Sequence, residues 1–188
     1  KNAPQAQNLT LKFITQELWL MANFRAFTLK AEGRLRQLVT ECGITPLNKD
    51  NKADIVYYKS IWDTGATSTV ITSKVAKDLK LEVTGTATNI HAGGVSQVPT
   101  YLVDIYLPNG IVVKEITVSE VVLADDIEIL IGMDLISLGD FSLTNVNGKS
   151  CFSFRVPSVK EIDYVLDAKK KNKWRKPSGN YNRGRKKR

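Results

Sequence analysis

The stretch Ile61-Trp62-Asp63-Thr64-Gly65-Ala66-Thr67 decides how this 188-residue chain is interpreted. It places an acidic residue at the end of an apolar strand, directly before a turn of small residues. Such a carboxylate is costly to bury unless it is hydrogen-bonded or shared with a partner. Gly65 lets the backbone come close to the carboxylate and leaves an amide free to point at it. The pattern fits either a functional carboxylate or an ordinary Asx-type turn between two strands.

A second pattern of the same kind lies further along the chain, in Glu128-Ile129-Leu130-Ile131-Gly132-Met133-Asp134-Leu135-Ile136. It predicts a short apolar strand, a glycine turn and the start of a short helix. Between the two patterns lies the glycine-bearing segment Ile90-His91-Ala92-Gly93-Gly94-Val95, followed by Pro99.

The middle of the chain is typical of short strands with little helix between them. Pro108-Asn109-Gly110 and Asn147-Gly148 are strong hairpin signals. Ser73 can cap a short helix that runs through Lys80. The strands are expected over 55–62, 69–72, 87–91, 100–107, 111–118, 127–131, 141–146 and 150–156. This pattern predicts a mainly β body that forms a closed or partly closed barrel.

The start of the chain shows a helical rather than a strand-like period. Apolar residues recur at spacings of three and four over 11–42, namely Leu18, Met21, Phe24, Phe27, Ala31, Leu35 and Leu38. Gly43 and Pro46 would end the helix. We therefore expect a helical N-terminal segment over 1–45, which packs on the body or on a second copy as a dimerisation scaffold. In an alternative role it covers the cleft, with Phe13, Leu18, Trp19, Phe24 and Phe27 in substrate pockets.

The end of the chain predicts a helix over 158–171 and a disordered tail over 172–188. Ser158 with Glu161 three residues later forms a capping-box signal. Residues 169–188 hold 11 Lys or Arg and no acidic residue, whereas residues 1–168 have a net charge of −3. Trp174 and Tyr181 lie among these basic residues. The composition indicates contact with nucleic acid or another polyanion, or else a solvated end.

Composition excludes several classes of site. The single histidine excludes sites with two or more histidine ligands, and two cysteines are too few for a disulfide scaffold or a zinc cluster. Cys42 and Cys151 are expected to be buried or free thiols. We expect no metal and no cofactor. No apolar run approaches the ~20 residues of a membrane span. No signal-peptide pattern is visible, and a cytoplasmic location is favoured.

Over residues 55–156 these patterns resemble the retroviral-type aspartic proteases, or retropepsins, and their cellular and bacterial relatives. Asp63-Thr64-Gly65-Ala66 is similar to the catalytic loop of that family, and Ile131-Gly132-Met133-Asp134 to its second motif. The resemblance implies a retropepsin-like aspartic protease domain over 46–157. It implies that Asp63 is catalytic, with support from Thr64, Gly65 and Ala66. It also implies a substrate-binding flap, which would contain His91, Ala92, Gly93, Gly94 and Val95.

The chain holds one Asp-Thr-Gly, and the resemblance implies that two carboxylates act together. It therefore implies a homodimer in which Asp63 of both chains shares one proton and activates water for hydrolysis of an extended polypeptide. Thr67 and Met133 depart from the family, whose viral members carry a carboxylate and an arginine there. Two alternatives are a catalytically silent module of the same fold that binds peptide or dimerises, and a nucleic-acid-associated protein that acts through its tail.

Overall fold

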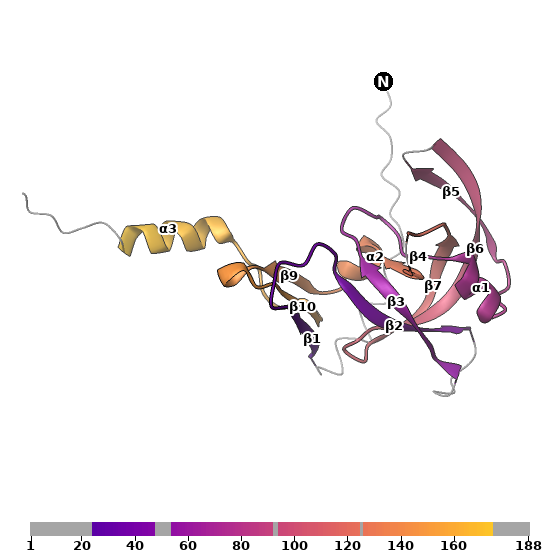
Figure 1. Ribbon diagram of the computed structural model, residues 1–188, viewed down its shortest axis with the longest axis horizontal. Helices are drawn as coiled ribbons and strands as arrows, with labels where there is room; N and C mark the ends of the chain where they lie inside the picture. Colours follow the sequence, from indigo (N-terminus) through magenta and orange to yellow (C-terminus); the bar gives the residue numbers. More distant parts are fainter. Residues whose placement is uncertain (1–23, 48–53, 92–93, 125, 175–188) are drawn as a thin grey trace, which may run out of the picture. The chain divides into compact units, whose positions relative to one another are not determined.

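The computed structural model describes residues 24–47, 54–91, 94–124 and 126–174 (Figure 1). The chain divides into two compact units at Ser158 and Val159. The first unit holds every described strand, and the second holds one helix.

The larger sheet of the first unit closes on itself. Its strands, in sheet order, are β2 (Val39–Pro46), β3 (Val56–Trp62), β8 (Ile129–Ile131), β4 (Val70–Ile71), β7 (Val112–Glu120), β6 (Gly94–Tyr106) and β5 (Gly85–His91). Because β2 pairs with β6 as well as with β3, six strands form a ring. Strand β5 extends from β6 as the second arm of a long hairpin (Figure 1). The mainly β, partly closed arrangement predicted from the sequence is confirmed.

Short helices and tight turns connect these strands close to where the sequence predicted them. The expected cap at Ser73 is wrong, because Ser73 is the first helical residue and Thr72 occupies the N-cap position. The short helices are α1 (Ser73–Asp78), α2 (Met133–Ile136) and the 3-10 helix η3 (Val146–Gly148). Gly110 has a φ of +75° in the turn between β6 and β7. Asn147 and Gly148 have φ of 53° and 78° in the connection from β9 (Asp140–Thr144) to β10 (Cys151–Val156). These left-handed conformations explain why glycine occupies position 110 and why Asn and Gly occupy positions 147 and 148.

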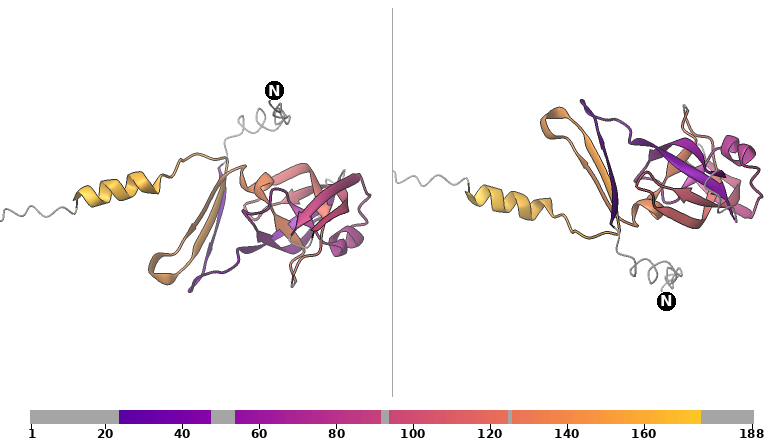
Figure 2. Two further views of the ribbon diagram at one scale, coloured as in Figure 1. Left: turned by 90° about the horizontal axis from the view of Figure 1, so that it is seen from above. Right: turned by 90° about the horizontal axis from the view of Figure 1, so that it is seen from below.

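A second, three-stranded sheet has the order β1 (Arg25–Lys30), β10 (Cys151–Val156) and β9 (Asp140–Thr144). Figure 2 shows the indigo strand β1 beside the orange hairpin of β9 and β10. Phe27 lies opposite Phe154, and Leu29 lies opposite Phe152. Because side chains alternate along a strand, these apolar residues share one face of the sheet.

One hydrophobic core joins the two sheets. The ring of Phe27 lies 5.6 Å from that of Trp62 and 5.3 Å from that of Phe152, measured between centroids. The ring of Trp62 lies 5.0 Å from that of Phe154. The same core continues through Ile44, Ile71, Val75, Val103, Ile105, Val118, Ile129, Ile131 and Leu135. Trp62, the residue before Asp63, is therefore held from both sheets.

The predicted helix over 11–42 is wrong in its described part, because residues 25–30 and 39–46 are strands. The spacing of Phe27 and Leu29 also fits an alternating strand, and pairing with β10 selects that alternative. Residues 11–23 lie outside the described residues. Since Phe27 is packed against Trp62, it is not available to cover a cleft. The two strands belong to the same unit as the rest of the β body.

The second unit contains α3 (Tyr164–Trp174). The predicted helix over 158–171 is wrong in its start, since the helix begins at Tyr164 rather than Ser158. The physical reason is that the side chain of Asp163, not of Ser158, accepts the first helical amides, from Val165 and Leu166. The helix continues to Trp174, so the prediction of a disordered tail from residue 172 is wrong for residues 172–174, while residues 175–188 lie outside the described residues. Among the described residues, no helix is long and apolar enough to cross a membrane.

Candidate active site

Asp63 lies where strand β3 ends beside strand β8. The two strands run parallel, with Trp62 opposite Ile131, and the Asp63 amide donates to the Ile131 carbonyl at 3.0 Å. The Asp63 side chain is half-buried, and the Gly65 amide donates to its Oδ1 at 2.8 Å. The expected contact between the Gly65 amide and the carboxylate is therefore present. This hydrogen bond fixes the orientation of the carboxylate at the start of the loop.

Gly132 allows the second motif to touch the Asp63 loop. A Cβ atom at this position would lie 2.5 Å from the carbonyl carbon of Ser68 and 2.6 Å from its oxygen. No real Cβ makes contacts this short with backbone atoms, so only glycine fits without a shift of the loop. The glycine of the second motif is thus required by the close approach of two backbone segments.

The side chain of Asp134 holds the far end of the loop. Its Oδ1 accepts from the Thr69 hydroxyl at 2.7 Å, and its Oδ2 accepts from the Thr69 amide at 2.8 Å. Thr69 is buried, and its hydroxyl oxygen accepts from the Gly132 amide at 3.1 Å. A charged acceptor makes such hydrogen bonds about twice as strong as neutral ones. Sequence analysis singled out Asp134 as a site residue but missed Thr69. The one signal for Thr69 is its position six residues after Asp63, at the end of the same loop.

Backbone hydrogen bonds connect the positions at which the sequence departs from the viral pattern. The Met133 amide donates to the Ala66 carbonyl at 2.8 Å, and the Asp134 amide donates to the Thr67 carbonyl at 3.2 Å. The Met133 side chain is exposed. The loop and the second motif are therefore joined within one chain without an ion pair between positions 67 and 133.

Trp62 anchors the other end of the loop. Its indole Nε1 donates to the Thr40 hydroxyl at 2.8 Å, and its amide donates to the Leu38 carbonyl at 2.9 Å. Both partners lie in or next to β2, in the segment for which the sequence predicted a helix. The N-terminal strands thus support the residue that precedes Asp63.

The segment predicted as a flap is the end of the hairpin of β5 and β6. The register pairs Gly85 with Thr100 at its base and His91 with Gly94 at its far end. Gly94 has a φ of +129°, and the Val95 side chain is exposed. Ala92 and Gly93 lie outside the described residues. Whether these residues bind substrate stays a prediction.

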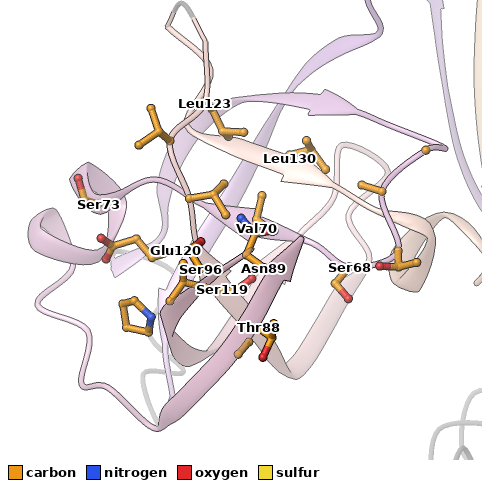
Figure 3. Close-up of a pocket in the computed structure, with 18 residues that line it drawn as sticks. Ser68, Val70, Ser73, Thr88, Asn89, Ser96, Ser119, Glu120, Leu123 and Leu130 are labelled. Atoms are coloured by element: carbon orange, nitrogen blue, oxygen red, sulfur yellow. The ribbon is translucent and has the colours of Figure 1, made fainter. Parts of the chain in front are cut away.

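A pocket of about 990 Å³ extends from the Asp63 loop along the hairpin (Figure 3). The loop contributes residues 65–68, the hairpin contributes Thr88, Asn89 and Ser96, and the end of β7 contributes Ser119 and Glu120. Val70 and Leu130 lie between these segments. Sequence reasoning missed the residues of β7, because nothing local shows that this strand ends beside the loop.

Burial raises the pKa of three groups near the core. One is Tyr58, whose hydroxyl donates to Asp78 at 3.2 Å and whose pKa is raised to about 12. Burial, together with the hydrogen bond to Glu120, raises the pKa of Tyr101 to about 12, so its hydroxyl stays a donor over the neutral range. Burial also raises the pKa of the Cys42 thiol. Cys42 and Cys151 are both free cysteines, as predicted. Within the described ranges, no group of three or more His, Cys, Asp or Glu side chains could hold a metal ion.

Comparison with known protein families finds a match to part of the chain. Residues 54–138 match the family described as gag-polyprotein putative aspartyl protease. No curated protein matches the chain.

Three solved structures are similar at low identity. A retropepsin-like aspartic protease from Rickettsia conorii is 19% identical over 71% of this chain and 96% of its own, with a TM-score of 0.44. The simian foamy virus (mac) protease is 18% identical over 53% and 92%, with a TM-score of 0.36. The retroviral protease-like domain of Ddi1 from Leishmania major is 18% identical over 69% and 99%, with a TM-score of 0.37.

Proposed function

Residues 54–138 of this chain match a family of aspartyl proteases and form part of a retropepsin-like fold, and on that premise we propose that the protein is an aspartic endopeptidase. Its substrate is an extended polypeptide, and its active form is a homodimer. The observation that carries the proposal is the Asp63 carboxylate, which the Gly65 amide holds at the start of a loop that lines a large pocket.

The proposed reaction uses two copies of Asp63 with one proton between them. Two carboxylates that share one proton lie too close together for both to be charged, so one is charged and the other is protonated. The charged carboxylate takes a proton from water as the water oxygen attacks the peptide carbonyl carbon. The protonated carboxyl gives its proton to the carbonyl oxygen. The tetrahedral diol then collapses, the C–N bond breaks, and the amine leaves with a proton while the pair returns to its one-proton state.

The need for a second chain follows from the number of carboxylates at the site. Asp63 is the one acidic residue of the loop over 63–69, and the Asp134 carboxylate is already occupied by Thr69. A twofold axis beside the loop would bring Asp63 of a partner into position. Thr64 and Gly65 are exposed, and the Thr64 hydroxyl makes no hydrogen bond to any described residue. Thr64 is therefore free to bond to the partner's loop.

The hairpin of β5 and β6 supplies the cover for the substrate. Among the described residues, strand β5 pairs with β6 alone, so its second edge has free amides and carbonyls. An extended peptide can pair with such an edge while its side chains enter the pocket. His91, Gly94 and Val95 are proposed to close over the peptide and exclude water from the reaction.

The test compares the wild-type protein with Asp63→Asn in a peptide-library digest on the acid side of neutrality. Asp126→Asn is the matched control, because Asp126 is exposed and pairs with Lys59 away from the loop. We expect cleavage by the wild type and the control and none by Asp63→Asn, with all three dimeric in sedimentation. Cleavage by Asp63→Asn, or a wild-type monomer that cuts nothing, would contradict the proposal. The second result would favour a peptide-binding module of the same fold.

A second proposal concerns the C-terminal unit, which we propose contacts nucleic acid or another polyanion. Lys169, Lys170, Lys171 and Lys173 are exposed on α3, and the basic run continues to Arg188. Such a run neutralises phosphates and releases their counterions. Deletion of residues 169–188 should abolish retention on immobilised RNA while leaving Asp63-dependent cleavage intact. Unchanged retention would contradict this proposal.

A further inference from the structure

One carboxylate in the pocket takes no part in the proposed reaction. Glu120, the last residue of β7, is the only charged residue among the described residues that line the pocket. Figure 3 shows Glu120 and Ser73 at one end of the pocket and Ser68 at the opposite end. Since Ser68 belongs to the loop that starts at Asp63, Glu120 lies at the end of the pocket away from this residue of the loop.

A neutral group fixes the orientation of Glu120. The Tyr101 hydroxyl donates to its Oε2 at 2.7 Å, and Tyr101 is only 5% exposed. None of the ion pairs formed by described residues includes Glu120. The negative charge of a half-buried, oriented carboxylate is therefore not balanced within the described part of the chain.

The space between Glu120 and the loop is neutral. Its lining includes the apolar side chains of Val70 and Leu130 and the small polar side chains of Ser96 and Ser119. A peptide that extends from the loop along this lining meets no second charge. A charge pair in a partly enclosed pocket attracts more strongly than one on the open surface, because less water surrounds it.

We infer that Glu120 determines specificity by selecting peptides with a Lys or Arg side chain at the position that reaches it. The inference rests on the proposed function, since it names the substrate class of that site. In a twofold-symmetric dimer each half of the groove contains one Glu120. The preferred substrate therefore carries one basic side chain on each side of the cut bond, at equal distances from it.

The experiment compares full-length wild type, Glu120→Gln and Glu120→Lys on peptides that differ at one position at a time, with Lys, Leu or Glu placed there. Glu82→Gln is the matched control, because Glu82 is exposed and does not line the pocket. The readout is the ratio of kcat/KM between the Lys and the Leu peptide for each variant. This ratio separates charge selection from a general loss of activity.

We expect kcat/KM of wild type and Glu82→Gln to be about fivefold higher for the Lys peptide than for the Leu peptide. This ratio corresponds to the attraction within one half-exposed charge pair. The ratio should fall to about one in Glu120→Gln, and Glu120→Lys should favour the Glu peptide instead. A ratio that stays high in Glu120→Gln, or a wild type with no basic preference at any position, would overturn the inference.

Failure of the proposed function gives a different result. If wild type cuts no peptide, the same peptides are labelled and their binding is measured by fluorescence anisotropy. Tighter binding of the Lys peptide that is lost in Glu120→Gln supports the inference without catalysis. Equal binding of all peptides, or no binding, overturns it. If Lys is preferred on only one side of the cut bond, the symmetric dimer is contradicted. Glu120 remains the cause of the preference in that case.

Discussion

Replacement of Asp134 by alanine tests how the chain holds its Asp63 loop. The variant removes the acceptors of three hydrogen bonds. Two, at 2.7 and 2.8 Å, come from the hydroxyl and amide of Thr69, and one, at 2.9 Å, comes from the neighbouring Leu135 amide. Thr69 is buried, so water does not readily replace the lost partner. A hydrogen bond to a charged group contributes about 1.5–3 kcal/mol. Because Asp134 is half-buried, we take the lower value for each of the two hydrogen bonds from Thr69, which gives a loss of about 3 kcal/mol.

The assay is equilibrium unfolding in urea, followed by circular dichroism. Asp134→Asn keeps the shape and one acceptor, so it should lose about half as much free energy of unfolding as Asp134→Ala. Asp126→Ala removes an exposed ion pair with Lys59 and should lower the free energy of unfolding far less than either Asp134 variant. A loss below about 1 kcal/mol for Asp134→Ala would refute the reasoning, because the two hydrogen bonds would then contribute nothing beyond a surface contact.

Four further variants, one of them a control, and one titration test other parts of the structure. Gly132→Ala places a Cβ 2.5 Å from the Ser68 carbonyl carbon, so it should lower the free energy of unfolding by about 1–3 kcal/mol and reduce kcat. Phe152→Ala empties the centre of the aromatic cluster and should cost about 3–5 kcal/mol in urea unfolding, whereas Leu143→Ala, partly exposed on β9, should cost much less. The pKa of Tyr101 is raised to about 12, so the folded state holds its proton more tightly than the unfolded state. The resulting stability is complete below the usual tyrosine pKa of about 10 and is lost as pH rises from there towards 12. Tyr101→Phe should remove one late-titrating group from the tyrosinate absorbance curve and flatten this alkaline loss.

Local patterns predicted most of the strands around the site, because every strand of the ring except β2, where the spacing favoured a helix, carries its own signal. Turns that need a left-handed backbone marked the hairpins at Asn109-Gly110 and Asn147-Gly148. The apolar run before Asp63 and the run before Gly132 are β3 and β8. No local pattern shows that these two strands are neighbours in the sheet. Before the structure was known, only the family resemblance indicated it.

Long-range contacts determined what the sequence could not provide. Phe27 and Leu29 fit a helix by their spacing to other apolar residues, and only pairing with β10 makes them a strand. Thr69 looked like one residue of an extended run, yet its hydrogen bonds reach Asp134 across 65 residues. Glu120 gave no local signal, because its position in the pocket depends on β7 ending beside β4. The residues that shape specificity are therefore the hardest to find from sequence.

The central claim is that two chains share one active site, and mixing subunits tests it most directly. Wild-type and Asp63→Asn chains are mixed in varying ratios, exchanged to equilibrium, and assayed for cleavage at constant total protein. If both Asp63 carboxylates are needed, activity falls with the square of the wild-type fraction, to about one quarter in an equal mixture. A linear decrease, with about one half of the activity left in that mixture, would show that each chain acts alone and would contradict the account.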